Sequence, residues 1–297
     1  MQWFWAALSA AMMTVAGFGA QISGDARAAD LLKQARTALG GDAKLAQVTG
    51  LSCAGTYTRA MPDRQLSGEL TIDLQLPDKM LRTDSMNPMG DATITVEQGF
   101  NGDTLLRHSA TSGGGPNMMI RMGGPNTPEA QAQMLKGVKA DAARLTLAML
   151  LTSMPEMPLE ASYVGEADAP DGTKADVVDA KGPGSFAARL FLDKSSHRPL
   201  MLTYRGVAPR IVVSTQRVQG PHDAAQMKDA ERTAEAAAPP APDVVDINMY
   251  FDDYKQESGL WFPHHVSRSI DGKPSEEWTF KTIAVNPAFK PDTFEPK

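Results

Sequence analysis

The stretch "GELTIDLQLPDKMLR", Gly68 to Arg82, alternates apolar and polar side chains along most of its length. Its apolar positions are Leu70, Ile72, Leu74 and Leu76. Successive side chains of a β-strand point to opposite faces of the sheet, so the pattern predicts a strand with one apolar and one polar face. The Pro-Asp pair after Leu76 is typical of a tight turn into a neighbouring strand.

Short segments with the same period lie on both sides of this stretch. We expect strands at 51–59, 79–85, 91–98 and 103–109, and the third carries Ile94 and Val96 on one face. Strands resume later in the chain, from "ASYVGEA" at 161–167 to "SEEWTFKTIAV" at 275–285, with an Asp271-Gly272 hairpin turn before the last. Together they indicate an antiparallel meander of about eleven strands.

Two segments have a helical period instead. Near the N-terminus, "AADLLKQARTALGG" places Leu31, Leu32, Ala35 and Leu39 on one stripe before a Gly-Gly pair that ends the helix. In the middle of the chain, Thr127 can cap a helix that has Pro128 in its first turn. The apolar stripe of this second helix is Met134, Val138, Leu145 and Met149.

A glycine-bounded segment, "SGGGPNMMIRMGGPN" at 112–126, precedes the second helix and is named here the methionine loop. Its methionines are Met118, Met119 and Met122. Glycine permits movement and methionine adapts to variable apolar shapes, so the loop could act as a flap over a ligand entrance, or it could be a plain connection. Residues 219–243 are rich in Ala, Pro and charge and predict a second, mobile loop between strands.

Two architectures accommodate these elements. One is a β-sandwich; the other is a single strongly curved sheet whose apolar concave face is closed by the helices. Residues 29–297 would form one such domain, with the methionine loop and the lid helix inserted at 112–151.

Composition excludes one class of partner. The chain has 297 residues, 42% of them hydrophobic, and a net charge of -6 without a basic run. Such a chain can bury a large core, but it offers no electrostatic footprint for a phosphate backbone. We therefore expect no nucleic-acid partner.

The N-terminus predicts export. Residues 1–24 contain no charged side chain, and Ala26-Arg27-Ala28 then offers the small-x-small pattern that signal peptidase requires. We expect a signal peptide at 1–28, a mature chain that begins at Ala29 and a periplasmic location. An uncleaved apolar segment that tethers the protein to the membrane is the alternative.

Chemical motifs are sparse. His264 and His265, the histidine pair, are neighbours on a predicted strand and would point to opposite faces, so they cannot chelate one ion together. One of them could instead face a ligand cavity. The sequence has no nucleophile elbow and no phosphate-binding loop. We expect no metal site, no cofactor and no enzymatic activity.

Three stretches together resemble the LolA/LolB-like periplasmic lipoprotein-sorting family. They are "GELTIDLQLPDKMLR", the hairpin "GFNGDTLLRHS", and the C-terminal "LWFPHHVSRSIDGKPSEEWTFKTIAVNPAFKPDTFEPK" with its N-P-x-F-x-P-D-x-F tail. The family's carriers place an Arg before the strand-ending Pro, where this chain has Leu76 before Pro77. Because of this difference, the resemblance does not imply that this chain binds the family's partners in the sorting pathway.

The resemblance implies an unclosed antiparallel β-barrel of about eleven strands, with a helical lid over a hydrophobic cavity. It also implies that the protein carries a lipid, an acyl chain or an acylated protein. The carrier would be a monomer, and contact with a membrane surface is possible. The expected lining is Leu70, Ile72, Leu74, Leu76, Ile94, Val96, Met118, Met119, Met122, Met134, Val138, Leu145 and Met149. Two alternatives stay open: these residues pack only against one another, or the sheet binds a protein partner, as in an envelope sensor.

Overall fold

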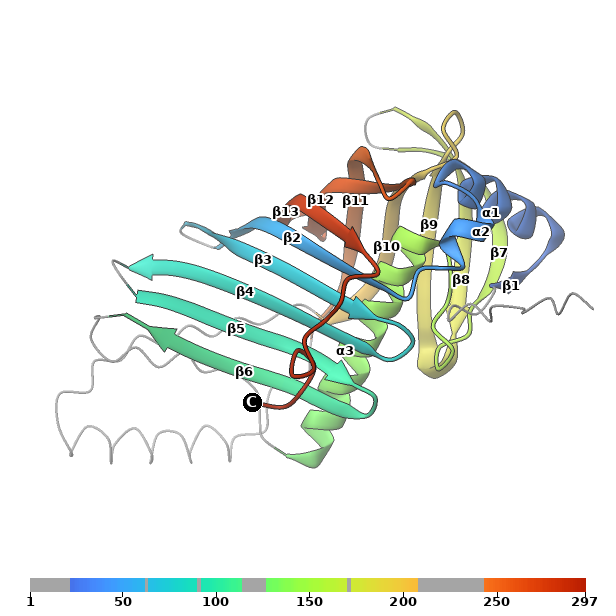
Figure 1. The fold of residues 1–297 in the computed structure, drawn as a ribbon. Helices are drawn as coiled ribbons and strands as arrows, with labels where there is room; N and C mark the ends of the chain where they lie inside the picture. Colours follow the sequence, from blue (N-terminus) through green and yellow to red (C-terminus); the bar gives the residue numbers. More distant parts are fainter. Residues whose placement is uncertain (1–21, 62–63, 90–91, 114–126, 170–171, 208–242) are drawn as a thin grey trace, which may run out of the picture.

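A computed structural model describes residues 22–61, 64–89, 92–113, 127–169, 172–207 and 243–297 (Figure 1). The strands form one sheet of 13 strands in the order β1-β7-β8-β9-β10-β11-β12-β13-β2-β3-β4-β5-β6. Its long strands pair antiparallel with their neighbours. β1 and β6 end the sheet without pairing to each other, so it is not closed into a barrel.

The strands are β1 (Ser23–Gly24), β2 (Gly50–Ala60), β3 (Gln65–Gln75), β4 (Lys79–Met89), β5 (Ala92–Asn101), β6 (Thr104–Ser112), β7 (Glu160–Asp168), β8 (Lys174–Gly182), β9 (Phe186–Asp193), β10 (Pro199–Val207), β11 (Val244–Glu257), β12 (Leu260–Ile270) and β13 (Lys273–Val285). The helices are α1 (Ala26–Ala38), α2 (Asp42–Leu45), α3 (Pro128–Leu150) and the short 3-10 turn η1 (Pro183–Ser185).

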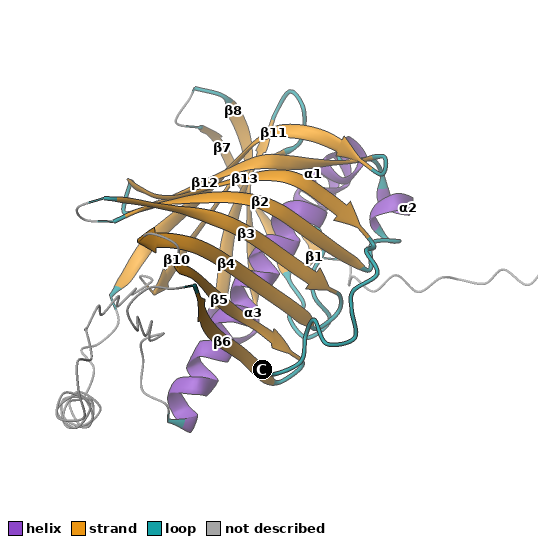
Figure 2. Cartoon of the chain, turned by 60° about the vertical axis from the view of Figure 1, so that its left-hand side comes forward, coloured by secondary structure: helices purple, strands orange, loops and turns teal. Residues whose placement is uncertain are grey.

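The sheet is strongly curved, and α3 crosses its concave side (Figures 1 and 2). The helix contacts β5 and β6 towards one end of the sheet and β9 and β10 towards the other. Leu70 and Ile72 of β3 share one buried cluster with Leu145 of α3. The core therefore lies between a single curved sheet and a helical lid, and the sandwich is wrong.

Both predicted helices are confirmed, together with the cap of α3. The Thr127 hydroxyl accepts a hydrogen bond from the Ala130 N–H at 3.3 Å, and Pro128 occupies the first turn. The other end of α3 is held by α1, because Arg36 Nη1 donates to the carbonyls of Leu150 and Leu151 at 3.2 and 2.8 Å. Those carbonyls have no partner within the helix, so the guanidinium satisfies them and complements the helix dipole.

Residues just before the predicted mature start are part of the fold. β1 pairs parallel with β7, and Asp25 accepts hydrogen bonds from the Ala28 and Tyr163 N–H groups, both at 2.8 Å. These two bonds hold the pKa of Asp25 below its usual value. Ala28 is fully buried. A mature chain that began at Ala29 would lack the cap of α1 and all of β1.

The C-terminal tail lies against the convex face of the sheet. Phe289 and Phe294 pack with Leu81 and Leu106, whose neighbours Met80 and Leu105 point to the concave side. The Asn286 side chain, at the start of the tail, accepts the Thr49 N–H at 2.7 Å. The aromatic residues of the tail therefore cover apolar convex-face positions of β4 and β6.

Three further findings concern the expected elements. The sheet has 13 strands where about eleven were expected, partly because the two-residue β1 has no sequence pattern of its own. The methionine loop from residue 114 onward, residues 1–21, and residues 208–242 of the Ala/Pro-rich region lie outside the described residues. Within the described part, no helix has both the length and the apolarity to cross a membrane.

Candidate ligand-binding site on the concave face

The predicted lining residues come together. Leu70, Ile72, Leu74, Leu76, Ile94, Val138, Leu145 and Met149 are buried in one cluster, against which Val96 is partly buried. Met134 is half-buried, and Met118, Met119 and Met122 lie outside the described residues. In this structure these side chains are buried in one cluster with those of α3, so a ligand would have to displace the helix from them.

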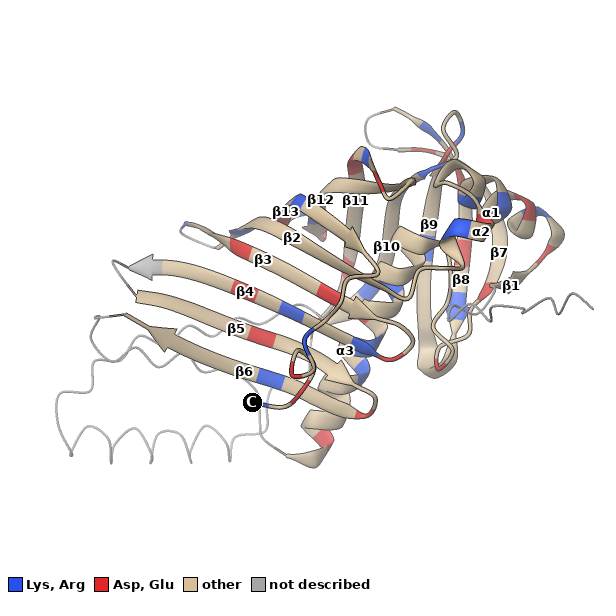
Figure 3. Cartoon of the chain, viewed as in Figure 1, with Lys and Arg blue, Asp and Glu red and all other residues tan. Residues whose placement is uncertain are grey.

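Charged residues share this face with the apolar ones. In the antiparallel pairing of β3 and β4, Arg82 lies opposite Ile72 and Asp84 opposite Leu70. Directly paired residues project to the same side of a sheet, so Arg82 and Asp84 face the concave side. Figure 3 shows charged positions of both signs within the long strands.

Four of these side chains, Arg59, Arg82, Asp84 and Glu276, form what we name the concave ion-pair network. Arg59 Nη2 lies 3.0 Å from Asp84 Oδ2 and 2.6 Å from Glu276 Oε1. Arg82 Nη2 lies 2.6 Å from the same Glu276 oxygen, and Arg82 Nε lies 2.8 Å from Asp84 Oδ1.

This network spans the sheet rather than following one strand. β4 and β13 are separated by β3 and β2, which in a flat sheet would put them about 14 Å apart. The direct contact between Arg82 and Glu276 is therefore a consequence of the curvature, which turns the two strands towards each other.

The network shifts the titration of its members. Burial alone would raise the pKa of Glu276, but the positive charges of Arg82 and Arg59 and their hydrogen bonds lower it to about 2. Burial opposes the charged form of Arg82, yet the two carboxylates raise its pKa above the usual value. Both groups are thus held charged inside the fold at neutral pH.

Aromatic rings lie against the network. The Arg82 guanidinium is 5.1 Å from the centre of the Trp278 ring, and that of Arg59 is 5.0 Å from the centre of the Tyr57 ring. Tyr57 Oη contacts the Met86 sulfur at 3.7 Å across Gly68, where a Cβ would lie only 2.9 Å from the tyrosine ring. Trp278 is buried, and its Nε1 has no hydrogen-bond partner among the described residues.

A second arginine group centres on Tyr204 of β10. Arg144 of α3 stacks on the Tyr204 ring, with its guanidinium carbon 3.8 Å from the ring centre. From β12, Arg268 Nη2 donates to the Tyr204 hydroxyl at 3.0 Å. Arg268 lies opposite Glu276 in the β12–β13 register, so this group adjoins the concave ion-pair network.

The histidine pair points to opposite faces, as expected. His264 is buried, with Nδ1 2.9 Å from the Phe280 carbonyl oxygen, whereas the half-buried His265 contacts Asp252 at 2.9 Å. His264 Nε2 is 3.3 Å from Glu257 Oε1, but the angles do not make a hydrogen bond. The described residues contain no group of three or more His, Cys, Asp or Glu side chains placed to hold a metal.

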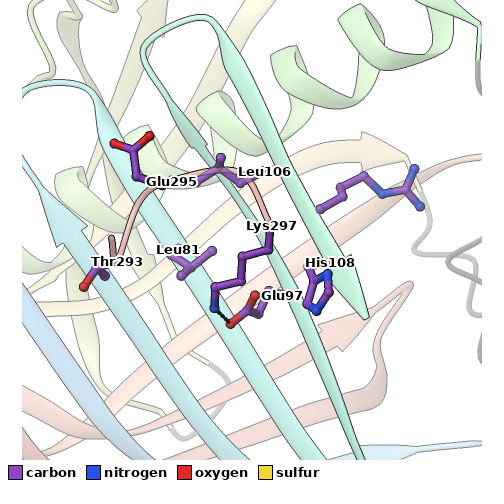
Figure 4. A pocket seen from close by; sticks show the side chains of 8 residues that line it. Leu81, Glu97, Leu106, His108, Thr293, Glu295 and Lys297 are labelled. Carbon is purple, nitrogen blue, oxygen red and sulfur yellow. Dashed lines mark hydrogen bonds and ion pairs between the residues drawn. The ribbon is translucent and has the colours of Figure 1, made fainter. Parts of the chain in front are cut away.

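A small pocket on the convex face is a different feature. It lies between the C-terminal tail and the strands and is lined by Leu81, Glu97, His108, Lys297 and their neighbours (Figure 4). Lys297 Nζ closes one side through an ion pair of 2.5 Å with Glu97 Oε1. Its volume of about 10 Å³ suits about one water molecule, so it cannot hold an acyl chain.

Sequence reasoning found the apolar face but missed the arginines on it. The signal was present in "KMLRTDS", because Arg82 and Asp84 stand two and four positions after Met80. Residues at such spacings lie on the same face of a strand, so both the arginine and the aspartate belong to the face of Met80. The partner Glu276 lies almost 200 residues further on, and no spacing rule connects the two.

No family model matches the sequence, and no curated protein matches it. Several solved structures align over most of the chain, among them the following three. An outer membrane lipoprotein-sorting protein domain from Vibrio parahaemolyticus is 10% identical, with 89% of this chain and 95% of that chain covered and a TM-score of 0.44. A LolA superfamily protein from Nitrosomonas europaea is 9% identical, with 91% and 97% covered and a TM-score of 0.44. A DUF1329 family protein from Desulfovibrio piger is 7% identical, with 90% and 97% covered and a TM-score of 0.45.

The names of two of these structures refer to the LolA superfamily or to lipoprotein sorting, as does the name of the family that the sequence resembles. Identities of 10% or less and TM-scores below 0.5 assign no function to this chain. Its function is therefore inferred from its own side chains.

Proposed function

We propose that the chain is an exported binding or carrier protein for an amphiphile, namely a lipid, an acyl chain or an acylated protein, held on the concave face beneath α3. The observation that supports this is the composition of that face. An apolar region built from residues such as Leu70 and Leu145 adjoins the partly buried arginines Arg59 and Arg82. An amphiphile likewise has an apolar chain, which could contact the apolar region, and a polar head group, which could contact the arginines.

Stability alone is a weak explanation for the charges. A buried ion-pair network contributes little more than well-packed apolar residues of the same volume would, and often less, because the charges must leave water. Charged groups with strongly shifted pKa values, such as Glu276, occur more often at functional sites than elsewhere.

The two ends of the lid differ, because the buried residues of α3 lie in its second half, from Val138 to Leu150. Helix α3 has no strand-type pairing to the sheet, and its first turns, from Pro128 to Gln133, are largely exposed. Its other end is anchored by Arg36. Rotation about the anchored end would uncover the concave face while leaving the sheet hydrogen bonds intact.

Native mass spectrometry of the purified mature protein tests this proposal. A co-purified lipid, removable by delipidation and restored by added fatty acid, is the expected result. A protein that carries no lipid and does not take up a fluorescent fatty acid would overturn the carrier role. Capture of a specific envelope protein by such an empty chain would favour the sensor alternative.

A further inference from the structure

Arg144 and Arg268 approach Tyr204 from a helix and a strand that are far apart in the sequence. Arg144 covers the ring at 3.8 Å and Arg268 holds the hydroxyl at 3.0 Å. Tyr204 is itself buried. Two guanidinium groups are therefore held on the concave face in contact with the same tyrosine side chain.

Within the described residues, neither arginine has a partner for every donor. Nε of Arg144 and Nε of Arg268 are buried without a hydrogen-bond partner among the described residues. Arg144 has an ion pair with Asp141 at 2.9 Å, but 57% of the Asp141 side chain is exposed to solvent. No described carboxylate forms an ion pair with Arg268. Unpaired donors and charges inside a fold are costly, so an arrangement of this kind suits a site that an anion completes.

The neighbouring network cannot supply that anion. Both carboxylates of the concave ion-pair network already bind Arg59 and Arg82. Among the described residues, neither of these two carboxylates forms an ion pair with Arg144 or Arg268. The Trp278 Nε1–H, which is buried and has no partner within the described part of the chain, lies two residues from Glu276 in β13 and adds a neutral donor there.

The apolar part of the face adjoins the same two arginines. Met249 lies opposite Arg268 in the β11–β12 pairing, and Leu202 lies opposite Met249 in the next pairing. Both are buried in the main cluster with α3. A head group at the arginines would leave its chain directly over apolar side chains.

We propose that Arg144 and Arg268 bind the anionic head group, a carboxylate or a phosphate, of the amphiphile carried on the concave face. This inference rests on the proposed carrier function and narrows its ligand to anionic amphiphiles. Guanidinium groups suit such head groups because they donate two parallel hydrogen bonds to two oxygens. A neutral amphiphile would leave the arginines unsatisfied and should bind more weakly.

The test compares oleate with oleyl alcohol, which has the same chain and no charge, by displacement of a fluorescent fatty acid from the full-length protein. Wild type should prefer oleate by at least about tenfold, as expected for a charge-assisted hydrogen bond. In Arg268→Gln and Arg144→Gln the affinity for oleate should fall by a similar factor, with oleyl alcohol nearly unchanged. Arg205→Gln is the matched control, because Arg205 follows Tyr204 on β10 and its side chain is 74% exposed.

The outcomes separate this inference from the carrier function. Equal affinity for oleate and oleyl alcohol in wild type would overturn the head-group site and leave the carrier function standing. Binding of neither would overturn both. Acetate or inorganic phosphate that displaces the probe as well as oleate does would show a site for free anions and would also overturn the proposal. Melting temperatures identify a variant that fails to fold, and Arg268→Lys, which keeps the charge, should then retain part of the preference.

Discussion

Glu276→Gln removes one negative charge from the concave ion-pair network while keeping the volume of the side chain. The change leaves Arg59 and Arg82 with only Asp84 as a buried counter-charge. The Glu276 side chain is 5% exposed, so solvent screens this loss very little. Breaking a buried ion pair by removal of one partner costs about 3–5 kcal/mol.

The pKa of Glu276 leads to a similar magnitude. Its folded value of about 2 lies below the ordinary value of 4.5. A carboxyl with its pKa lowered by this amount stabilises the folded state by about 3 kcal/mol at neutral pH. Since the folded pKa is the lower one, this stabilisation is present above pH 4.5 and is lost as the pH falls towards 2.

Urea unfolding followed by circular dichroism at several pH values measures the effect. Wild type should exceed Glu276→Gln by about 3 kcal/mol at pH 7, and the difference should shrink towards zero as the pH approaches 2. Glu277→Gln is the control, because Glu277 is exposed and points to the opposite face. An unchanged free energy of unfolding in Glu276→Gln at pH 7, or a difference that does not vary with pH, would refute the reasoning.

Three further predictions come from the sequence and the fold. Elemental analysis should find no stoichiometric transition metal, and one equivalent of zinc that disappears when either member of the histidine pair is changed to Ala would contradict this. Intact-mass measurement on the envelope fraction should show a trimmed chain, with Ala29 as the expected first residue; a mature chain that keeps Asp25 would show cleavage further upstream. Changing the three methionines of the methionine loop to Ser should weaken uptake of a fluorescent fatty acid with little change in melting temperature, whereas Leu74→Asp should lower both, because it buries a charge. Unaltered uptake in the triple variant would make the loop a plain connection.

The alternation of polar and apolar residues was enough to predict the sheet. Leu70, Ile72 and Leu74 follow the period of two and are buried on one face, and the stripe of α3 was visible from Val138 to Met149. These signals are local, because each depends on residues a few positions apart. The same period also predicted that the histidine pair would separate.

The polar half of the concave face could not be predicted in this way. Contacts such as Arg82 with Glu276 depend on the curvature of the whole sheet, which no short segment encodes. The β1–β7 pairing involves only two residues, so no pattern in the sequence near Ser23 marks it as a strand. In both cases the deciding partner lies more than a hundred residues away.

Quenching of Trp278 by a bromine-labelled fatty acid tests most directly whether the concave face binds an amphiphile. Trp278 is buried on that face beside Arg82, whereas Trp261 stacks on Arg198 from the other side of β12, with 4.0 Å between the guanidinium carbon and the ring centre. In the mature protein carrying Trp261→Phe, we expect dibromostearate to quench the remaining emission in a saturable way, and stearate to reverse it by competition. Saturable binding that leaves Trp278 unquenched would place the ligand elsewhere and contradict the account.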